Sequence, residues 1–128
     1  AEIDDHDEGM GARANIARAE RELGEYFSGT RTRFGVPLDR SARRGFRGAV
    51  LDALERVGFG ETITYGVLAE RAGRPRAARA VGTAMATNPI AILVPCHRVL
   101  PSTGGVGQYA GTSAVKQYLL TLEGVTLA

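Results

Sequence analysis

A chain of 128 residues has room for one domain, or for one domain and an appendage. Hydrophobic residues make up 44% of it, which is enough for a modest core, and no apolar run is long enough to cross a bilayer. The acidic start lacks the basic and then apolar pattern of a secretory signal, and one cysteine cannot form an internal disulfide, so we expect a cytoplasmic protein.

Charge is distributed unevenly along the chain. The net charge is +2, but the first eight residues hold five acids and no base, and the remainder holds 16 bases against 9 acids. From Arg71 onward there are six bases and a single acid, Glu123. A basic half of this kind suits a polyanionic partner such as DNA, although a solvated basic surface would have the same composition.

The first forty residues predict little regular structure beyond one helix. Residues 1–12 are acidic and show no periodicity, which predicts a disordered segment. Residues 14–27 have helical spacing, and we expect that helix to pack on the rest of the protein. The side chains expected to do so are Ile16, Leu23 and Phe27. Alternation over residues 34–38 suggests a short strand, which should be irregular or paired with a neighbouring chain because this region offers no second strand.

The middle of the chain predicts three helices. Ser41 could cap the first of them, whose apolar face runs from Phe46 to Val57. Residues 64–72 and about 75–86 form two further helices, broken at Gly73-Arg74-Pro75. Helix, short turn and helix is the pattern of a helix-turn-helix, although an ordinary helical hairpin is commoner.

The last forty residues predict a short apolar segment, a loop and a helix. Residues 90–94 should be strand-like or extended, and residues 101–111 form a glycine-rich loop. The closing helix, residues 114–122, is expected to turn four side chains inward, namely Val115, Tyr118, Leu119 and Leu122. The predicted core comprises Phe46, Val50, Leu54, Leu68, Val81, Ile92, Leu119 and Leu122.

The single cysteine is the strongest candidate for chemistry. A lone cysteine in an apolar setting is more often inert, but Cys96 adjoins His97, the one histidine outside the acidic start. Arg98 and the basic half around it would favour the thiolate, which is the nucleophilic form. One cysteine and one histidine cannot fill a zinc site. A cysteine protease would draw its histidine from far along the chain, where only His6 is available.

A series of motifs resembles one protein family. Residues Pro95-Cys96-His97-Arg98-Val99 resemble the active-site signature of the O6-alkylguanine-DNA alkyltransferases, also called methylated-DNA–protein-cysteine methyltransferases. The likeness runs from about Leu23 to Glu123 at the family's spacing. Its other members are Gly60-Glu61-Thr62, Thr64-Tyr65-Gly66, residues 77–82, Asn88-Pro89, residues 107–111, Lys116, Leu119-Leu120 and Glu123.

The resemblance implies a role for each matching residue of the reaction centre. Cys96 would be the nucleophile and permanent alkyl acceptor, His97 would take its proton through a bound water, and Glu123 would orient His97. Asn88 would hold the turn around the active-site segment. The cysteine should lie near the second helix of the helix-turn-helix, partly buried at the base of a groove.

The resemblance also implies a set of DNA and substrate contacts. Tyr65 would help rotate the guanine out of the duplex, and Arg79 would fill the space that it leaves. The backbone carbonyl of Val99 would contact the flipped base. The remaining predicted contacts are Tyr109 lining the pocket, the backbone amide of Ala110, and the small residues Ala78 and Gly82, which let the second helix lie close to the minor groove.

These expectations combine into one architecture and one activity. The fold class is mainly α, a helix-turn-helix (winged-helix-like) alkyltransferase C-terminal domain with a remnant of an α/β N-terminal domain. The domains would be a disordered segment over 1–12, the remnant and linker over 13–40, and the DNA-binding and active-site domain over 41–128. The activity would be that of a methylated-DNA–[protein]-cysteine S-methyltransferase, acting once as a monomer on double-stranded DNA that contains O6-alkylguanine. No cofactor, metal or membrane would take part, and the protein would work in the bacterial cytosol or nucleoid.

Two other functions remain open. Alkyltransferase-like lesion binders share the fold but lack the acceptor cysteine, usually having tryptophan there, whereas this chain has Cys96 and no tryptophan. A helix-turn-helix regulator would read base edges, but the second helix offers mostly small residues and the single Arg79.

Overall fold

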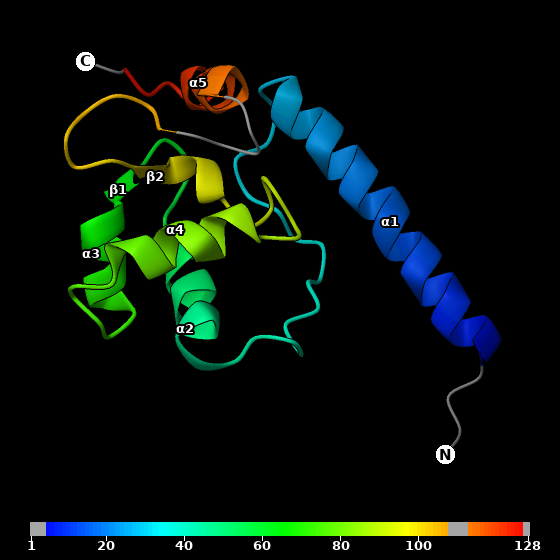
Figure 1. Cartoon of the computed structure of the whole chain (residues 1–128). Coiled ribbons are helices and arrows are strands. Elements are labelled where there is room, and N and C mark those ends of the chain that lie inside the picture. The colour runs from blue at the N-terminus through cyan, green and yellow to red at the C-terminus, as the bar shows by residue number, and fades with distance from the viewer. Residues whose placement is uncertain (1–4, 108–112, 127–128) are drawn as a thin grey trace. The chain divides into compact units, whose positions relative to one another are not determined.

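The computed structural model describes residues 5–107 and 113–126. These residues form five α-helices, one 3-10 turn and a two-stranded sheet (Figure 1). The chain divides after Asp39 into two compact units, Ala1–Asp39 and Arg40–Ala128. None of the described helices is both long and apolar enough to span a membrane.

The first unit is dominated by one long helix, α1, Asp5–Phe27 (Figure 1). It begins earlier than expected, so the prediction of disorder over residues 1–12 is wrong from Asp5 onward, while residues 1–4 lie outside the described residues. Three of the acids that suggested disorder, Asp5, Asp7 and Glu8, fall in the first turn, where negative charge stabilises the positive end of the helix dipole. Ile16 and Phe27 are exposed, and the packing proposed for this helix stays a prediction.

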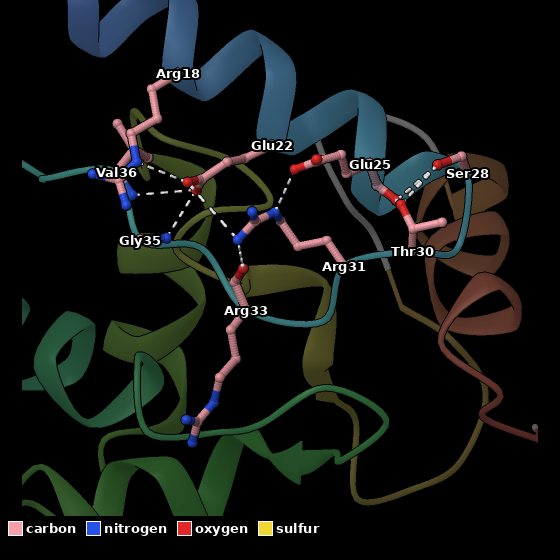
Figure 2. A network of polar contacts seen from close by, with 9 residues as sticks. All are labelled: Arg18, Glu22, Glu25, Ser28, Thr30, Arg31, Arg33, Gly35 and Val36. Atoms are coloured by element: carbon pink, nitrogen blue, oxygen red, sulfur yellow. Dashed lines mark hydrogen bonds and ion pairs between the residues drawn. The ribbon is translucent and has the colours of Figure 1, made fainter.

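The segment after α1 is irregular and is held by a buried carboxylate. Glu22 accepts hydrogen bonds from the backbone amides of Gly35 (2.8 Å) and Val36 (3.2 Å) and from Arg18 Nε (2.9 Å), as Figure 2 shows. Arg31 adds an ion pair at 3.8 Å. Residues 34–38 therefore form no strand, because a side chain of α1 binds the amides that a strand partner would need.

The second unit begins with two arginines that bind the C-terminal end of helix α2, Gly45–Leu54. Arg44 is its N-cap and makes no side-chain cap bond, so Ser41 is not the cap that the sequence suggested. At the other end, the C-cap residue Glu55 accepts hydrogen bonds from Arg40 and from Arg43. The hydrogen bond from Arg40 is the largest influence on the pKa of Glu55 and lowers it. Burial, the second influence, raises this pKa, but Arg40 and Arg43 together outweigh it.

The helix-turn-helix consists of α3, Tyr65–Arg71, and α4, Ala78–Ala86. Thr64 caps α3, since its hydroxyl accepts a hydrogen bond from the Val67 amide at 3.1 Å. Gly73 has a positive φ of 98°, which lets the chain leave α3 in a left-handed conformation. The second helix starts three residues later than expected because residues 74–77 form a separate turn, closed by the Ala77 amide on the Arg74 carbonyl.

A two-stranded parallel sheet joins the helix-turn-helix to the segment that contains the cysteine. Strand β1, Ile63–Thr64, pairs with β2, Val99–Leu100, with Ile63 opposite Val99. Because β1 leads directly into α3 and β2 follows the 3-10 turn η1, Cys96–Arg98, the pairing holds the start of α3 beside the active-site segment (Figure 1).

Helix α5, Ser113–Leu122, closes the described part of the unit. Its inward face differs from the predicted one, since Val115 and Tyr118 are exposed while Lys116 and Leu120 are buried with Leu119. The predicted core is otherwise largely correct. Its fully buried members are Val50, Leu54, Leu68, Val81 and Leu119, whereas Phe46, Ile92 and Leu122 are half-buried.

Candidate active site

The segment that leads to the cysteine is held by the side chain of Asn88. Its Nδ2 donates to the Val94 carbonyl (3.0 Å) and its Oδ1 accepts from the Ile90 amide (3.1 Å). The Val94 amide also returns to the Ile90 carbonyl (3.0 Å). The segment therefore folds back on itself, and the strand-like or extended conformation expected for residues 90–94 is wrong.

Two three-residue turns lie between Asn88 and Cys96. In the first, the Leu93 amide donates to the Ala91 carbonyl across Ile92, whose φ is +72°. This conformation is rare and strained for a β-branched residue. In the second, the Cys96 amide donates to the Val94 carbonyl (2.8 Å) across Pro95, with φ −82° and ψ 63°. The proline thus fixes the backbone immediately before the sulfur-bearing residue.

Cys96 and His97 are adjacent in the chain, and Glu123, 26 residues after His97, meets the imidazole. All three side chains are buried, and Cys96 is 6% exposed. His97 Nε2 lies 2.7 Å from Glu123 Oε2. Since an ionised carboxylate has no hydrogen to donate, Nε2 carries the hydrogen of this contact, and a neutral His97 ring has its lone pair on Nδ1.

The Glu123 carboxylate has three further donors. Arg98 donates through Nε to Oε1 (2.8 Å) and through a terminal nitrogen to Oε2 (3.0 Å), and the Gly60 amide donates to Oε1 (3.1 Å). The other terminal nitrogen of Arg98 donates to the Val57 carbonyl (2.7 Å). A buried charge needs this degree of pairing, because an uncompensated one would be costly.

A second cation, Lys116, lies near enough to Cys96 for their charges to interact. Its side chain is fully buried, and within the described residues its Nζ has no hydrogen-bond partner. Nζ is 5.7 Å from the centre of the Tyr65 ring, and a Cβ on Gly107 would come within 3.4 Å of it. Burial lowers the pKa of Lys116 to about 8, while the charge of Cys96 acts in the opposite direction. Burial also raises the pKa of Tyr65, and Cys96 adds to that effect.

The predicted DNA contacts lie in different places. Tyr65 is half-buried at the start of α3, and Val99 is buried in β2. On α4, Ala78 and Arg79 are exposed and Gly82 is half-buried, so the helix presents small residues and one cation to solvent. Tyr109 and Ala110 lie outside the described residues. In residues 5–107 and 113–126, no three His, Cys, Asp or Glu side chains gather as a metal site requires.

Three contributors to this site were missed from the sequence. The guanidinium of Arg98 binds Glu123, whereas the sequence suggested only a general effect on the thiol. Gly60 supplies a backbone amide, which no side-chain pattern announces. Lys116, the one lysine of the chain, did carry a signal, because it lies seven residues before Glu123 and hence on the same face of α5.

A helix-turn-helix beside a buried Cys–His–Glu cluster defines the class of protein. Residues 45–125 match the family model described as the 6-O-methylguanine DNA methyltransferase, DNA binding domain. The chain therefore belongs to this family, which confirms both the resemblance seen in the sequence and the mainly α fold class.

Individual relatives agree with the family. The chain is 48% identical over 108 residues to the methylated-DNA–protein-cysteine methyltransferase of Mycolicibacterium paratuberculosis, covering 84% of this chain and 65% of the relative. Among solved structures, Mycobacterium tuberculosis OGT in complex with DNA is similar at 46% identity and a TM-score of 0.77, covering 84% of this chain and 66% of that one. S. pombe Atl1, in complex with damaged DNA containing O6-carboxymethylguanine, is similar at 34% identity and a TM-score of 0.57, covering 63% and 77%. The chain thus spans about two thirds of the length of the first two relatives.

Proposed function

We propose that this protein transfers an alkyl group, such as methyl, from O6 of guanine in double-stranded DNA to the sulfur of Cys96, once per molecule. The observation that carries the proposal is the buried contact of His97 Nε2 with Glu123 Oε2 beside the only cysteine of the chain. The relatives named as methylated-DNA–protein-cysteine methyltransferases support it.

The proposed reaction is a displacement at the alkyl carbon. Cys96 releases its proton to His97 through a bound water, and the thiolate forms a bond to the alkyl carbon. The bond from that carbon to O6 breaks, its electrons pass to the guanine, and the guanine takes up one proton. A thioether has no leaving group that water displaces readily, so the protein is consumed in one turnover.

The cluster divides the work between orientation and charge. Glu123 orients His97 and stabilises the imidazolium that forms when the proton arrives. The buried ammonium of Lys116 stabilises the negative sulfur, because opposite charges attract strongly in a low-dielectric site. Asn88 keeps the turn in front of Cys96 in place.

DNA binding would use the exposed face of α4. We propose that Ala78 and Gly82 allow this helix to lie in the minor groove, that Arg79 enters the duplex, and that Tyr65 helps rotate the guanine into the pocket. Expelling a stacked base costs a few kcal/mol, which an inserted side chain partly offsets. We assign Val99, Tyr109 and Ala110 to the pocket in the same way. The DNA complexes of M. tuberculosis OGT and S. pombe Atl1 support this partner.

Intact-mass measurement tests the proposal. After incubation with duplex DNA that contains O6-methylguanine, the chain should gain the mass of one methyl group, located at Cys96, and Cys96→Ala should gain none. Tight binding of the lesion without any mass change would identify a lesion binder. Repeated turnover by one chain would refute the single-use reaction.

We also propose a cytoplasmic location and a monomeric state. One cysteine leaves no internal disulfide to be formed in an oxidising compartment, and the proposed thiolate needs a reducing one. Fractionation of the source cells with an antibody to the chain, and light scattering of the purified protein, test the two statements.

A further inference from the structure

Arg98 makes more contacts with Glu123 than His97 does. It binds both carboxylate oxygens, at 2.8 and 3.0 Å, while His97 binds one, at 2.7 Å. Its remaining terminal nitrogen is anchored on the Val57 carbonyl. A guanidinium held at both ends fixes the plane and rotation of the carboxylate, which a single contact from the imidazole cannot do.

The adjacency of the two residues makes this arrangement specific. His97 and Arg98 follow Cys96 in one 3-10 turn, and both reach the same carboxylate. The Gly60 amide, 63 residues from Glu123, closes the remaining side of Oε1. Glu123 Oε2 accepts from both His97 and Arg98, so the position of the oxygen that binds the imidazole depends on Arg98.

Charge gives Arg98 a second effect. With Arg98 present, Glu123 is neutralised by a buried partner, and a neutral His97 can receive the proton of Cys96 without changing the net charge of the cluster. Without Arg98, the buried carboxylate would itself draw a proton to the cluster, either onto itself or onto His97. Forming the thiolate would then leave one uncompensated negative charge, which requires a higher pH.

We propose that Arg98 is a positioning residue for the alkyl transfer: it fixes the orientation and the ionised state of Glu123, and through Glu123 the orientation of the His97 imidazole next to Cys96. This inference rests on the proposed function for its consequence in repair, but its effect on the sulfur is independent of DNA. The other titratable groups that face Cys96 are Lys116 from α5 and Tyr65 from α3, and both are left unchanged in the test.

The test follows the labelling of Cys96 by iodoacetamide as a function of pH. The cysteine is unique, so the label that peptide mass spectrometry locates at Cys96 reports its thiolate alone. Arg98→Gln should move the pH midpoint of the labelling rate upward by about one pH unit, the lower end of the range for an opposite charge in direct contact, because Arg98 acts on Cys96 through Glu123 and His97. Arg56→Gln removes an exposed arginine of the same unit and should leave the midpoint where it is in the unchanged protein.

Arg98→Lys separates charge from geometry. It keeps the cation but loses the two-point grip, so its labelling midpoint should stay close to that of the unchanged protein while its methyl transfer from duplex DNA is about tenfold or more slower. A merely structural role would lower the thermal midpoint of unfolding without moving either quantity. If Arg98→Gln does not fold, Arg98→Lys carries the test alone.

Two results would overturn the assignment: an unmoved midpoint in folded Arg98→Gln, or unchanged transfer in Arg98→Lys. If labelling shifts as expected but no variant, including the unchanged protein, transfers methyl, then Arg98 controls the thiolate of Cys96 through Glu123 and His97, and the proposed function is wrong.

Discussion

Replacing Lys116 with methionine should make the folded protein more stable at neutral pH. The Lys116 side chain is fully buried, and within the described residues its ammonium donates no hydrogen bond. Burial lowers the pKa of this group from the ordinary 10.5 to about 8. A buried cation without a hydrogen-bond partner opposes folding, whereas methionine has a similar length and no charge to desolvate.

The size and the pH range of the effect follow from the pKa. A fall from 10.5 to about 8 corresponds to a cost of about 3 kcal/mol for holding the protonated lysine in the folded state. Below pH 8 both folded and unfolded chains bind the proton, so the cost is complete. Between pH 8 and 10.5 the unfolded chain binds more protons, and the free energy of unfolding rises with pH. Lys116→Met should therefore gain up to about 3 kcal/mol at pH 7, and much less at pH 10.

Urea unfolding of both proteins at pH 7, 9 and 10 measures this gain. Lys116→Arg is the matched control, because it keeps a buried charge and should show no gain. A Lys116→Met variant that is less stable than the unchanged protein at pH 7 would refute the reasoning. The same variant should transfer methyl more slowly, since the thiolate loses its neighbouring cation, which would identify Lys116 as a residue retained for activity at a cost in stability.

Three further predictions concern other parts of the chain. Asn88→Ala should lower the free energy of unfolding by about 1–3 kcal/mol and slow methyl transfer, because the Ile90 amide loses its bond to Asn88 and the Val94 carbonyl loses one of its two donors. Urea unfolding and a transfer assay measure both effects, and unchanged transfer would mean that the turn does not depend on Asn88. Glu22→Gln should speed hydrogen exchange at the Gly35 and Val36 amides at neutral pH. Burial opposes ionisation of Glu22, but hydrogen bonds from Arg18, Gly35 and Val36 outweigh it and lower its pKa, so the difference should vanish in acid, where Glu22 itself is protonated; equal exchange rates at pH 7 would contradict this account. Arg79→Ala should impair transfer from duplex DNA yet spare reaction with free O6-benzylguanine, which needs no base flipping, and equal losses on both substrates would make Arg79 structural.

The helices of the second unit were predictable because their apolar periodicity is strong. Residues 45–54, 65–71 and 78–86 were all expected as helices, and the adjacency of Cys96 and His97 located the site. The inward face of α5 was not predicted correctly, since Val115 and Tyr118 are as apolar as the residues that are buried. The buried side of that helix includes Lys116 and continues to Glu123, two charged residues that hydrophobic periodicity assigns to the surface.

The conformation around Asn88 and Ile92 could not be predicted from periodicity. A run of apolar residues before a proline favours an extended chain, but two side-chain bonds of Asn88 fold it back and hold Ile92 at a positive φ. The early start of α1 is a different case. Low hydrophobicity and high charge indicated disorder, whereas acids at a helix N-terminus favour order. Composition alone does not show which of these two effects is larger.

Helix α5 shows why the reaction centre and the core cannot vary independently. Lys116, Leu119, Leu120 and Glu123 follow one another at the spacing of a single helical face, and all four are buried. The two leucines bury apolar surface, which stabilises the unit, and that burial fixes the rotation of the helix. The same rotation brings the Lys116 ammonium within electrostatic reach of Cys96 and a carboxylate to His97 and Arg98. A shift of one residue along α5 would expose both leucines and turn both charges away from Cys96 and His97. The leucine packing that stabilises the helix therefore also keeps two costly buried charges in place.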